Sequence, residues 1–308
     1  MERGALAAMG TRFEIIVAGE SASHARAAIE SALAEIEHCH HLWNPFSGDS
    51  VVARLHDTSR TEVPVDGLTL ELIELCDRLQ RETDGAFSAT VGSVLASRDP
   101  RRSSQKEWTG NTGSSPLTDT SFKIHRQPPH VQILATDLRW DFGAIAKGFA
   151  LDLAVEVLRD SGVENAFLHG GASSVTVMGS APGLKGWRVQ LPHGKVVTLT
   201  DGESLAVSSG LGNYDGSHLV DPVSGEWIEG MALGCWVRGN CSAEVDAWAT
   251  ALLVSTRRPV TLEIAGTEET DWGIFEIPER EEFGEELNPV ECIGLRDSEA
   301  PLRNAGSA

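Results

Sequence analysis

The sequence predicts a globular α/β or α+β protein with mixed sheets. Short segments with alternating apolar residues, such as "TRFEIIV" and "KVVTLT", are typical of strands that bury one face. Longer segments such as "SASHARAAIESALAEIEHC" place apolar residues three or four positions apart, which is typical of amphipathic helices. Strand and helix patterns follow one another along the chain without an internal repeat of fixed period.

The N-terminal half starts with the strand "TRFEIIV" and continues mainly with helices. The first helix, which Ser21 or Ser23 could cap, carries an apolar stripe. Its members are Ala28, Ile29, Ala32, Leu33 and Ile36. "HLWNPFSGDSVVARLHD" is interpreted as a loop and a short helix, and the helix "LTLELIELCDRLQRETDG" ends at Gly85. The polar residues 98–128, with scattered Gly, Ser and Pro, are predicted to form a mobile surface excursion.

The C-terminal half alternates between strands and helices. "VQILAT" is a strand, and residues 141–162 start with an acid and a glycine turn and continue as an amphipathic helix. "NAFLHGGASSVTVMG" predicts two strands around a glycine turn. Three further strands, a helix and a last strand follow: "WRVQL", "KVVTLT", "SLAVSSG", "SAEVDAWATALLVS" and "DWGIFEI". We therefore predict one domain over residues 1–280 and an acidic, frayed tail over residues 281–308.

Charge and cysteine usage limit the possible partners and compartments. The 308 residues carry a formal net charge of -20, from 45 acidic and 25 basic side chains, which argues against a nucleic-acid partner. A phosphorylated ligand would need a local cation or backbone amides to approach such a protein. Five cysteines form no CxxC pair, and no apolar segment is long enough for a secretory signal or a membrane span. These features predict a cytoplasmic protein with no membrane contact.

Asp246 and Thr250 lie four residues apart in a predicted helix, so their side chains project from one face. A carboxylate and a hydroxyl suit a hard cation such as Mg²⁺, which binds oxygen ligands and leaves positions for phosphate oxygens. In the alternative, Asp246 complements the N-terminus of the helix and Thr250 bonds the carbonyl one turn back. On spacing alone, this structural alternative is preferred.

Three other features invite a functional interpretation. Lys147 lies in the first turn of a predicted helix, where the helix dipole disfavours a cation. His218 could act as a base or contact a phosphate, although a lone histidine is more often a partly buried structural residue. Residues 169–174, "HGGASS", offer glycines and hydroxyls to a ligand but form neither a P-loop nor a Rossmann fingerprint. Cys39, His40 and His41 are consecutive and cannot chelate one ion together from a helix.

Several short blocks occur in this order along the chain: "MGTRFEI", "FSGDSVVARL", "DGAFSATVG", "DFGAIAKGFALD", "GVENAFLHGGASSVTVMG", "SLAVSSG", "SHLVDPVSGE" and "AEVDAWATAL". The blocks span roughly residues 9–255, most of the chain. Their order resembles that of the ApbE family, the FAD:protein FMN transferases. The Asp-Phe-Gly-Ala-Ile-Ala-Lys-Gly block and the Asp-Ala-x-x-Thr block are the most specific.

The resemblance implies an α/β fold with two lobes and mixed sheets, and with the flavin in a central cleft. It also implies an activity: Mg²⁺-dependent transfer of the FMN half of FAD to a threonine or serine hydroxyl of an acceptor protein, with release of AMP. Cleavage of the FAD pyrophosphate is phosphoryl transfer, in which positioning and charge neutralisation dominate. Two alternatives stay open: hydrolysis of FAD to FMN and AMP, and FAD binding without turnover.

The resemblance assigns roles to residues at matching positions. Asp246, Thr250 and the carbonyl of Ala144 would bind the metal, and His218 would activate the acceptor hydroxyl. Lys147 would lie beside the cofactor, where a cation is favourable despite the helix dipole. The remaining positions would contact the cofactor: Met9, Phe46, Phe87, Ser88, Ala89, Asp141 and Val220.

This sequence also departs from the family pattern. Ser88 stands where the family usually has Asp, and "HGGASS" replaces a stretch that carries a carboxylate. Ser208 to Gly210, "SSG", stands where Thr-Ser-Gly is usual, and no lipobox cysteine precedes the domain. These departures suggest a divergent cytoplasmic branch. With these departures, the resemblance supports FAD binding more strongly than it supports the transfer reaction.

Overall fold

The central element of the protein is an eight-stranded sheet. The computed structural model describes residues 1–57, 59–96, 121–135, 138–210, 219–229, 231–257 and 271–277, and the backbone of residues 291–292 and 303–304. The strand order is β12-β11-β10-β7-β6-β2-β1-β14. Neighbouring strands are antiparallel, except that β1 and β14 are parallel. The mixed α/β class expected from the sequence is therefore confirmed. The strands are β1 Glu2–Ala8, β2 Thr11–Ala18, β6 Asn165–Gly170, β7 Ser174–Met178, β10 Ser204–Ser209, β11 Leu233–Gly239, β12 Asp271–Glu276 and β14 Arg303–Asn304.

Both faces of this sheet are covered. In β2, Ile15 and Val17 join the core beneath the helices, whereas Ile16 and Ala18 join a second core on the other face. All five residues of β7 are buried, as expected for a central strand. The second core is closed by a three-stranded sheet, β13-β8-β9. Its strands are β8 Trp187–Gln190, β9 Val196–Leu199 and β13 Glu291–Cys292.

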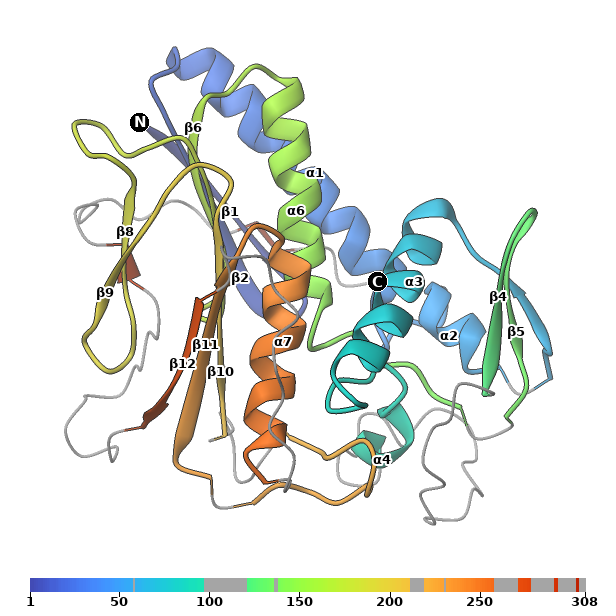
Figure 1. Cartoon of the computed structure of the whole chain (residues 1–308). Coiled ribbons are helices and arrows are strands. Elements are labelled where there is room, and N and C mark those ends of the chain that lie inside the picture. The colour runs from blue at the N-terminus through green and yellow to red at the C-terminus, as the bar shows by residue number, and fades with distance from the viewer. Residues whose placement is uncertain are drawn as a thin grey trace.

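Three helices cover one face of the large sheet, and Figure 1 shows α6 standing between α1 and α7. They are α1 Ala22–Trp43, α6 Ala146–Asp160 and α7 Ser242–Ser255. The apolar stripe predicted for α1 is buried, and Ser21 caps the helix by accepting the N–H of His24 at 3.4 Å. Helix α7 is apolar around most of its circumference, which is typical of a helix packed on several sides. It contacts β7, β10, β11 and α6.

The smaller lobe, at the right of Figure 1, carries the remaining elements. It contains α2 Val51–Leu55, β3 Glu62–Pro64, α3 Gly67–Glu82, α4 Gly92–Ala96, β4 Phe122–Arg126 and β5 Pro129–Ile133. The three strands form a sheet in the order β3-β5-β4. No helix within the described residues is both long and apolar enough to cross a bilayer.

Two predicted segments differ from expectation or lie outside the described residues. The polar excursion predicted for residues 98–128 lies outside them up to residue 120, but residues 122–126 form β4. The physical reason is that Phe122 and Ile124 turn toward the core while β4 pairs with β5. The predicted tail, residues 281–308, is described only where β13 pairs with β8 and β14 pairs with β1.

Candidate functional site

Asp246 is the residue around which α7, α6 and β7 meet. The residue is buried, with 5 % of its surface exposed. Its Oδ2 atom accepts the backbone N–H of Gly148 at 2.9 Å, and its Oδ1 atom accepts the hydroxyl of Ser174 at 2.6 Å. The carboxylate is therefore held from two sides, by the first turn of α6 and by the first residue of β7. Such double fixation leaves its remaining lone pairs in a defined direction.

The close approach of α6 to α7 depends on Gly148. A Cβ atom at this position would lie 2.2 Å from the carbonyl oxygen of Ser242 and 2.7 Å from the nitrogen of Ala243. One turn further along α6, Asp152 accepts the N–H groups of Ser242 and Ala243 at 2.8 and 2.9 Å. These are two of the amides that a helix N-terminus leaves without intrahelical partners. Helix α6 thus supplies the N-terminal cap of α7 and thereby fixes the direction in which Asp246 projects.

Lys147 lies beside the Asp246 carboxylate. Its Nζ atom is 4.0 Å from Oδ2 of Asp246 and donates to the carbonyl of Gly143 at 3.3 Å. Burial raises the pKa of Asp246, and the positive charge of Lys147 and the hydrogen bonds from Ser174 and Gly148 oppose this rise. The unfavourable position of a lysine in the first turn of α6 therefore has a local compensation, which is the buried carboxylate.

Thr250 follows Asp246 by one turn on the same face of α7. Its Oγ1 atom is 3.1 Å from the hydroxyl of Ser208 on β10, and 3.4 Å from the backbone carbonyl of Asp246. The bond to the preceding turn is the one that the structural alternative predicted for Thr250. For Asp246 that alternative was incorrect, because the carboxylate accepts an amide of α6 rather than one at its own helix N-terminus.

The turn before α6 connects Asp141 to Lys147. Oδ1 of Asp141 accepts the N–H of Gly143 at 2.9 Å, and the carbonyl of Gly143 in turn accepts Lys147. Ala144 lies in this turn and is partly buried against the core. The backbone N–H of Asp141 donates to the carbonyl of Ala89 at 2.7 Å. Asp141, Lys147, Asp246 and Thr250 thus lie in one chain of contacts, and Ala89 joins it through its backbone.

Residues 87–89 are buried in the smaller lobe. Phe87 and Ala89 are each 2 % exposed. The Ser88 hydroxyl donates to the side-chain oxygen of Gln80 at 2.9 Å and lies 2.9 Å from the hydroxyl of Thr90. The hydroxyl at the position where the family usually has a carboxylate is therefore part of a local polar network. Residues 87–89 therefore contact the rest of the protein chiefly through buried side chains and backbone groups.

The other predicted contact residues are more dispersed. Met9 lies at the tip of the β1–β2 hairpin and packs against the helix-side core. Phe46 follows α1 and is 47 % exposed, whereas Val220 is buried and forms a bridge with Trp227. His218 lies outside the described residues, so its predicted role stays a prediction.

Several residues of the site were missed in the sequence, although signals for some of them were present. Ser174 belongs to the "HGGASS" segment, and Gly148 follows Lys147 directly. The contribution of Asp152 depends on a contact with residues 90 and 91 positions away, for which a single sequence gives no signal. The side chain of Arg139, two residues before Asp141, is half-buried and has no hydrogen-bond or ion-pair partner among the described residues. Burial lowers the pKa of its guanidinium, so an anionic ligand nearby would be favourable.

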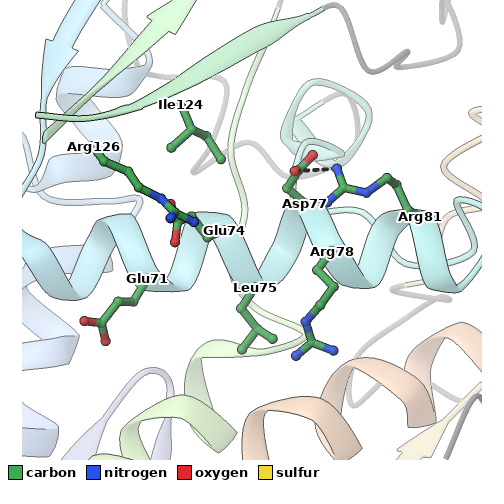
Figure 2. A pocket seen from close by; sticks show the side chains of 8 residues that line it. All are labelled: Glu71, Glu74, Leu75, Asp77, Arg78, Arg81, Ile124 and Arg126. Carbon is green, nitrogen blue, oxygen red and sulfur yellow. Dashed lines mark hydrogen bonds and ion pairs between the residues drawn. The ribbon is translucent and has the colours of Figure 1, made fainter.

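A hollow of about 640 Å³ lies between α3 and β4, apart from this cluster (Figure 2). Its three arginines each pair with an acidic side chain. Arg126 binds Glu74 at 2.6 Å and Arg81 binds Asp77 at 2.5 Å, while Arg78 reaches Glu244 on α7. Because these arginines are already neutralised, the hollow is a weaker candidate for an anionic ligand than the Asp246 cluster.

Comparison with known proteins identifies the family. The model of the ApbE family matches residues 9–267. The FAD:protein FMN transferase of Escherichia coli (strain K12) is 27% identical over 271 residues, which cover 80% of this chain and 76% of that protein. The FAD:protein FMN transferase of Rhodobacter capsulatus is 30% identical over 275 residues, which cover 80% of this chain and 50% of that protein.

Solved structures agree on the fold. A mutant of the flavin transferase ApbE from Vibrio cholerae superimposes with a TM-score of 0.72 at 18% identity, over 84% of this chain and 89% of that one. The ApbE protein of Thermotoga maritima gives a TM-score of 0.70 at 22% identity, over 84% and 88% of the two chains. Since the family model covers most of the sequence and the folds agree, this chain belongs to the ApbE family.

Proposed function

We propose that this protein transfers the FMN half of FAD to a threonine or serine hydroxyl of an acceptor protein, with release of AMP and with Mg²⁺ as the required metal. One observation carries the proposal: Lys147, Asp246 and Thr250, which belong to the two most specific sequence blocks, converge where α6, α7, β7 and β10 meet. The curated relatives named above, which are called FAD:protein FMN transferases, support it.

The residues around Asp246 fit a hard cation. A carboxylate offers roughly four acceptor positions, and Gly148 and Ser174 occupy two of them. Thr250 and the carbonyl of Ala144 would add the neutral oxygen ligands that Mg²⁺ accepts. Burial raises the pKa of Asp246 even with Lys147 nearby, so a further positive charge would be favourable there. When bound, Mg²⁺ would neutralise negative charge on the phosphate oxygens of FAD.

The protein's own residues would bind and orient the dinucleotide. Lys147 would supply a positive charge near the pyrophosphate, and Asp141, held by the Gly143 amide, would accept a flavin or ribose hydroxyl. Arg139 is a second candidate for a phosphate or other anionic group, because its guanidinium is half-buried. Two cations are valuable to a protein with a net charge of -20, which would otherwise repel FAD.

The reaction would replace the phosphoanhydride bond of FAD with a phosphoester bond to the acceptor. The acceptor hydroxyl oxygen would bond to the phosphorus of the FMN half, while the bond from that phosphorus to the bridging oxygen breaks. AMP would leave with the bridging oxygen, and the hydroxyl proton would pass to His218 as general base. Gly148 and Ser174 would keep the Asp246 carboxylate oriented, and this role needs no bound metal.

Because the cysteine count is odd and no CxxC pair occurs, we place the reaction in the cytoplasm.

The transfer is tested by incubating the protein with FAD, Mg²⁺ and candidate acceptor peptides or co-expressed acceptor proteins. We expect flavin fluorescence that stays on the acceptor after denaturation, together with AMP in equal amount. Omission of Mg²⁺ or of the acceptor should abolish the labelling. If no acceptor ever gains flavin, the transferase proposal is wrong.

Hydrolysis of FAD to FMN and AMP is a second candidate, favoured by one observation. Ser88 and the "HGGASS" segment lack the carboxylates usual at these positions, and the Ser88 hydroxyl is engaged with Gln80 and Thr90. Water would then replace the acceptor hydroxyl at the same metal site. Chromatography of the same incubations distinguishes the two reactions, because hydrolysis yields free FMN and AMP without labelled acceptor.

A further inference from the structure

The tip of the β1–β2 hairpin has an unusual backbone conformation. Ala8 pairs with Thr11, so Met9 and Gly10 form a two-residue turn. Their φ angles are 49° and 72°. Two-residue hairpins of this kind require positive φ at both central positions, which Asn, Asp and Gly adopt far more readily than Met. A methionine held in the left-handed region points to a constraint imposed by its surroundings.

His40 supplies such a constraint. The backbone N–H of Met9 donates to Nδ1 of His40 at 3.2 Å, across 31 positions of sequence. His40 lies in the last turn of α1, which packs along β1 and β2. Its ring is half-buried, so the hydrogen bond is shielded from competing water. The bond therefore fastens the hairpin tip to the end of the helix.

The direction of this bond fixes the protonation state of His40. Because the Met9 amide is the donor, Nδ1 must carry no proton, and the ring must be neutral with its hydrogen on Nε2. Burial lowers the pKa of His40, and His41 lowers it further, while Glu37 acts in the opposite direction. His41 and Glu37 both belong to α1, and the His41 ring centroid lies 5.5 Å from that of His40. Protonation would place a second N–H opposite the Met9 amide and break the bond.

The hairpin tip lies at the same end of the central sheet as the Asp246 cluster. Phe13 on β2 pairs with Gly170 on β6, and the N–H of Gly171 donates to the carbonyl of Arg12 at 2.7 Å. The turn that begins at Gly171 leads directly into Ser174, which binds Asp246. A change at the tip is therefore transmitted to the wall of the proposed flavin site through two short backbone connections.

We propose that His40 is a positioning residue, whose neutral ring holds Met9 in its left-handed conformation and so presents the Met9 side chain to the flavin. The inference rests on the proposed function, in which Met9 contacts the cofactor. It predicts that acid weakens flavin binding through His40 and not through the phosphates of FAD. As the pH falls through the titration of His40, the hairpin tip is released and affinity for FAD decreases.

Three variants test this positioning role. His40→Asn places a carboxamide oxygen where Nδ1 stands, so it keeps an acceptor that does not titrate. His40→Leu removes the acceptor at similar size. His41→Leu is the matched control, because His41 is exposed and adjacent. Two quantities are measured: hydrogen exchange at the Met9 amide in the FAD-free protein, and FAD affinity between about pH 5 and pH 8.

Near neutral pH, the His40→Leu variant should exchange the Met9 amide roughly tenfold faster and bind FAD roughly tenfold more weakly than wild type. The His40→Asn and His41→Leu variants should match wild type there. As the pH falls toward 5, wild-type affinity should decrease toward that of His40→Leu, and it should decrease less in His40→Asn. Hydrogen exchange is measured without flavin, so it tests the positioning role of His40 separately from the proposed function. A wild-type protein that binds no FAD refutes the proposed function.

Equal Met9 exchange in wild type and His40→Leu refutes the positioning role. That role is also refuted if the His40→Asn variant loses FAD affinity in acid as wild type does. Should the His40→Leu variant fail to fold, His40→Asn still decides the question through its pH profile.

Discussion

Oδ2 of Asp246 and the backbone N–H of Gly148 form a hydrogen bond of 2.9 Å that joins α7 to the first turn of α6. The two residues are 98 positions apart and come from the two most specific blocks of the sequence. The glycine allows the helices to approach, and its amide then orients the carboxylate. The proposed metal ligand and the helix that carries Lys147 are therefore one structural unit.

Replacement of Asp246 by Asn should abolish function while the fold is retained. The variant relieves the cost of burying a charge, but it also removes the attraction between that charge and Lys147. These two effects on stability partly offset each other, and the side chain keeps its shape. We expect loss of Mg²⁺-induced thermal stabilisation and a fall of at least roughly hundredfold in AMP release from FAD. Asp160→Asn, an exposed carboxylate on α6, is the matched control. Turnover that survives in Asp246→Asn would remove the metal assignment, and an absence of AMP even in wild type would favour FAD binding without turnover.

Replacement of Gly148 by Ala should separate α6 from α7. The added Cβ would meet the backbone of Ser242 at 2.2 Å, and a backbone atom has little freedom to move. We expect a loss of about 1–3 kcal/mol in the free energy of unfolding, measured in urea, and a loss of turnover because Asp246 is displaced. Gly67→Ala is the matched control, since that position is helical and meets nothing within 4 Å. A Gly148→Ala protein as stable as wild type would show that the helices can move apart at no cost.

Much of the fold follows from local patterns, because alternation and helical spacing report which face of an element is buried. The pattern of "SAEVDAWATALLVS" predicted α7 over its full length, and "SLAVSSG" predicted β10. β11, Leu233–Gly239, was missed although it lies within the central sheet, because its glycines and charged residue break the apolar run. β4 was missed because only Phe122 and Ile124 turn inward from a polar segment.

The candidate site was predicted less completely than the fold. Spacing placed Asp246 and Thr250 on one face of a helix, and the structure gives them that arrangement. The spacing did not reveal that Ser174 and Ser208 lie opposite these two residues, because the contacts depend on the order of strands in the sheet. Phe87 matches a cofactor position by resemblance, yet its ring lies in the core. Contacts between distant segments carry no periodic signal, so a single sequence leaves them open.

The pH dependence of stability should carry a contribution from Asp152. Burial raises the pKa of its carboxyl from 3.8 to about 6, against the opposing effect of the α7 amides. Between these values the folded protein keeps a proton that the unfolded chain has released. This group's contribution to stability is therefore complete below about pH 4 and is lost as the pH rises through about 6.

The measurement compares urea unfolding of wild type and Asp152→Asn at several values from about pH 4 to pH 7. We expect the stability of wild type relative to the variant to fall by about 3 kcal/mol across this range, as the shift in pKa from 3.8 to about 6 requires. A difference that grows with pH would mean that the bonds from Ser242 and Ala243 outweigh burial and depress the pKa of Asp152.

Lys147→Met should weaken both FAD binding and the FAD-free protein. The methionine keeps most of the apolar stem but removes the charge that lies 4.0 Å from Oδ2 of Asp246. A desolvated charge-assisted hydrogen bond contributes roughly 1.5–3 kcal/mol, so FAD affinity should fall about tenfold to a hundredfold. The Asp246 carboxylate would lose a compensating charge, and the free energy of unfolding should fall by about 1–2 kcal/mol, between the values for exposed and buried ion pairs. This exceeds the small gain from removing a cation at a helix N-terminus.

The double variant Lys147→Met with Asp246→Asn separates the two effects of Lys147. Once the carboxylate is neutral, removal of Lys147 should no longer lower the stability of the FAD-free protein, since no buried charge is left unpaired. FAD affinity should still fall, because the phosphates keep their charge. Fluorescence quenching and thermal melting of all four proteins provide the measurements. Stability losses that simply add would show that Lys147 acts independently of Asp246, and an unchanged FAD affinity in Lys147→Met would remove Lys147 from the proposed binding site.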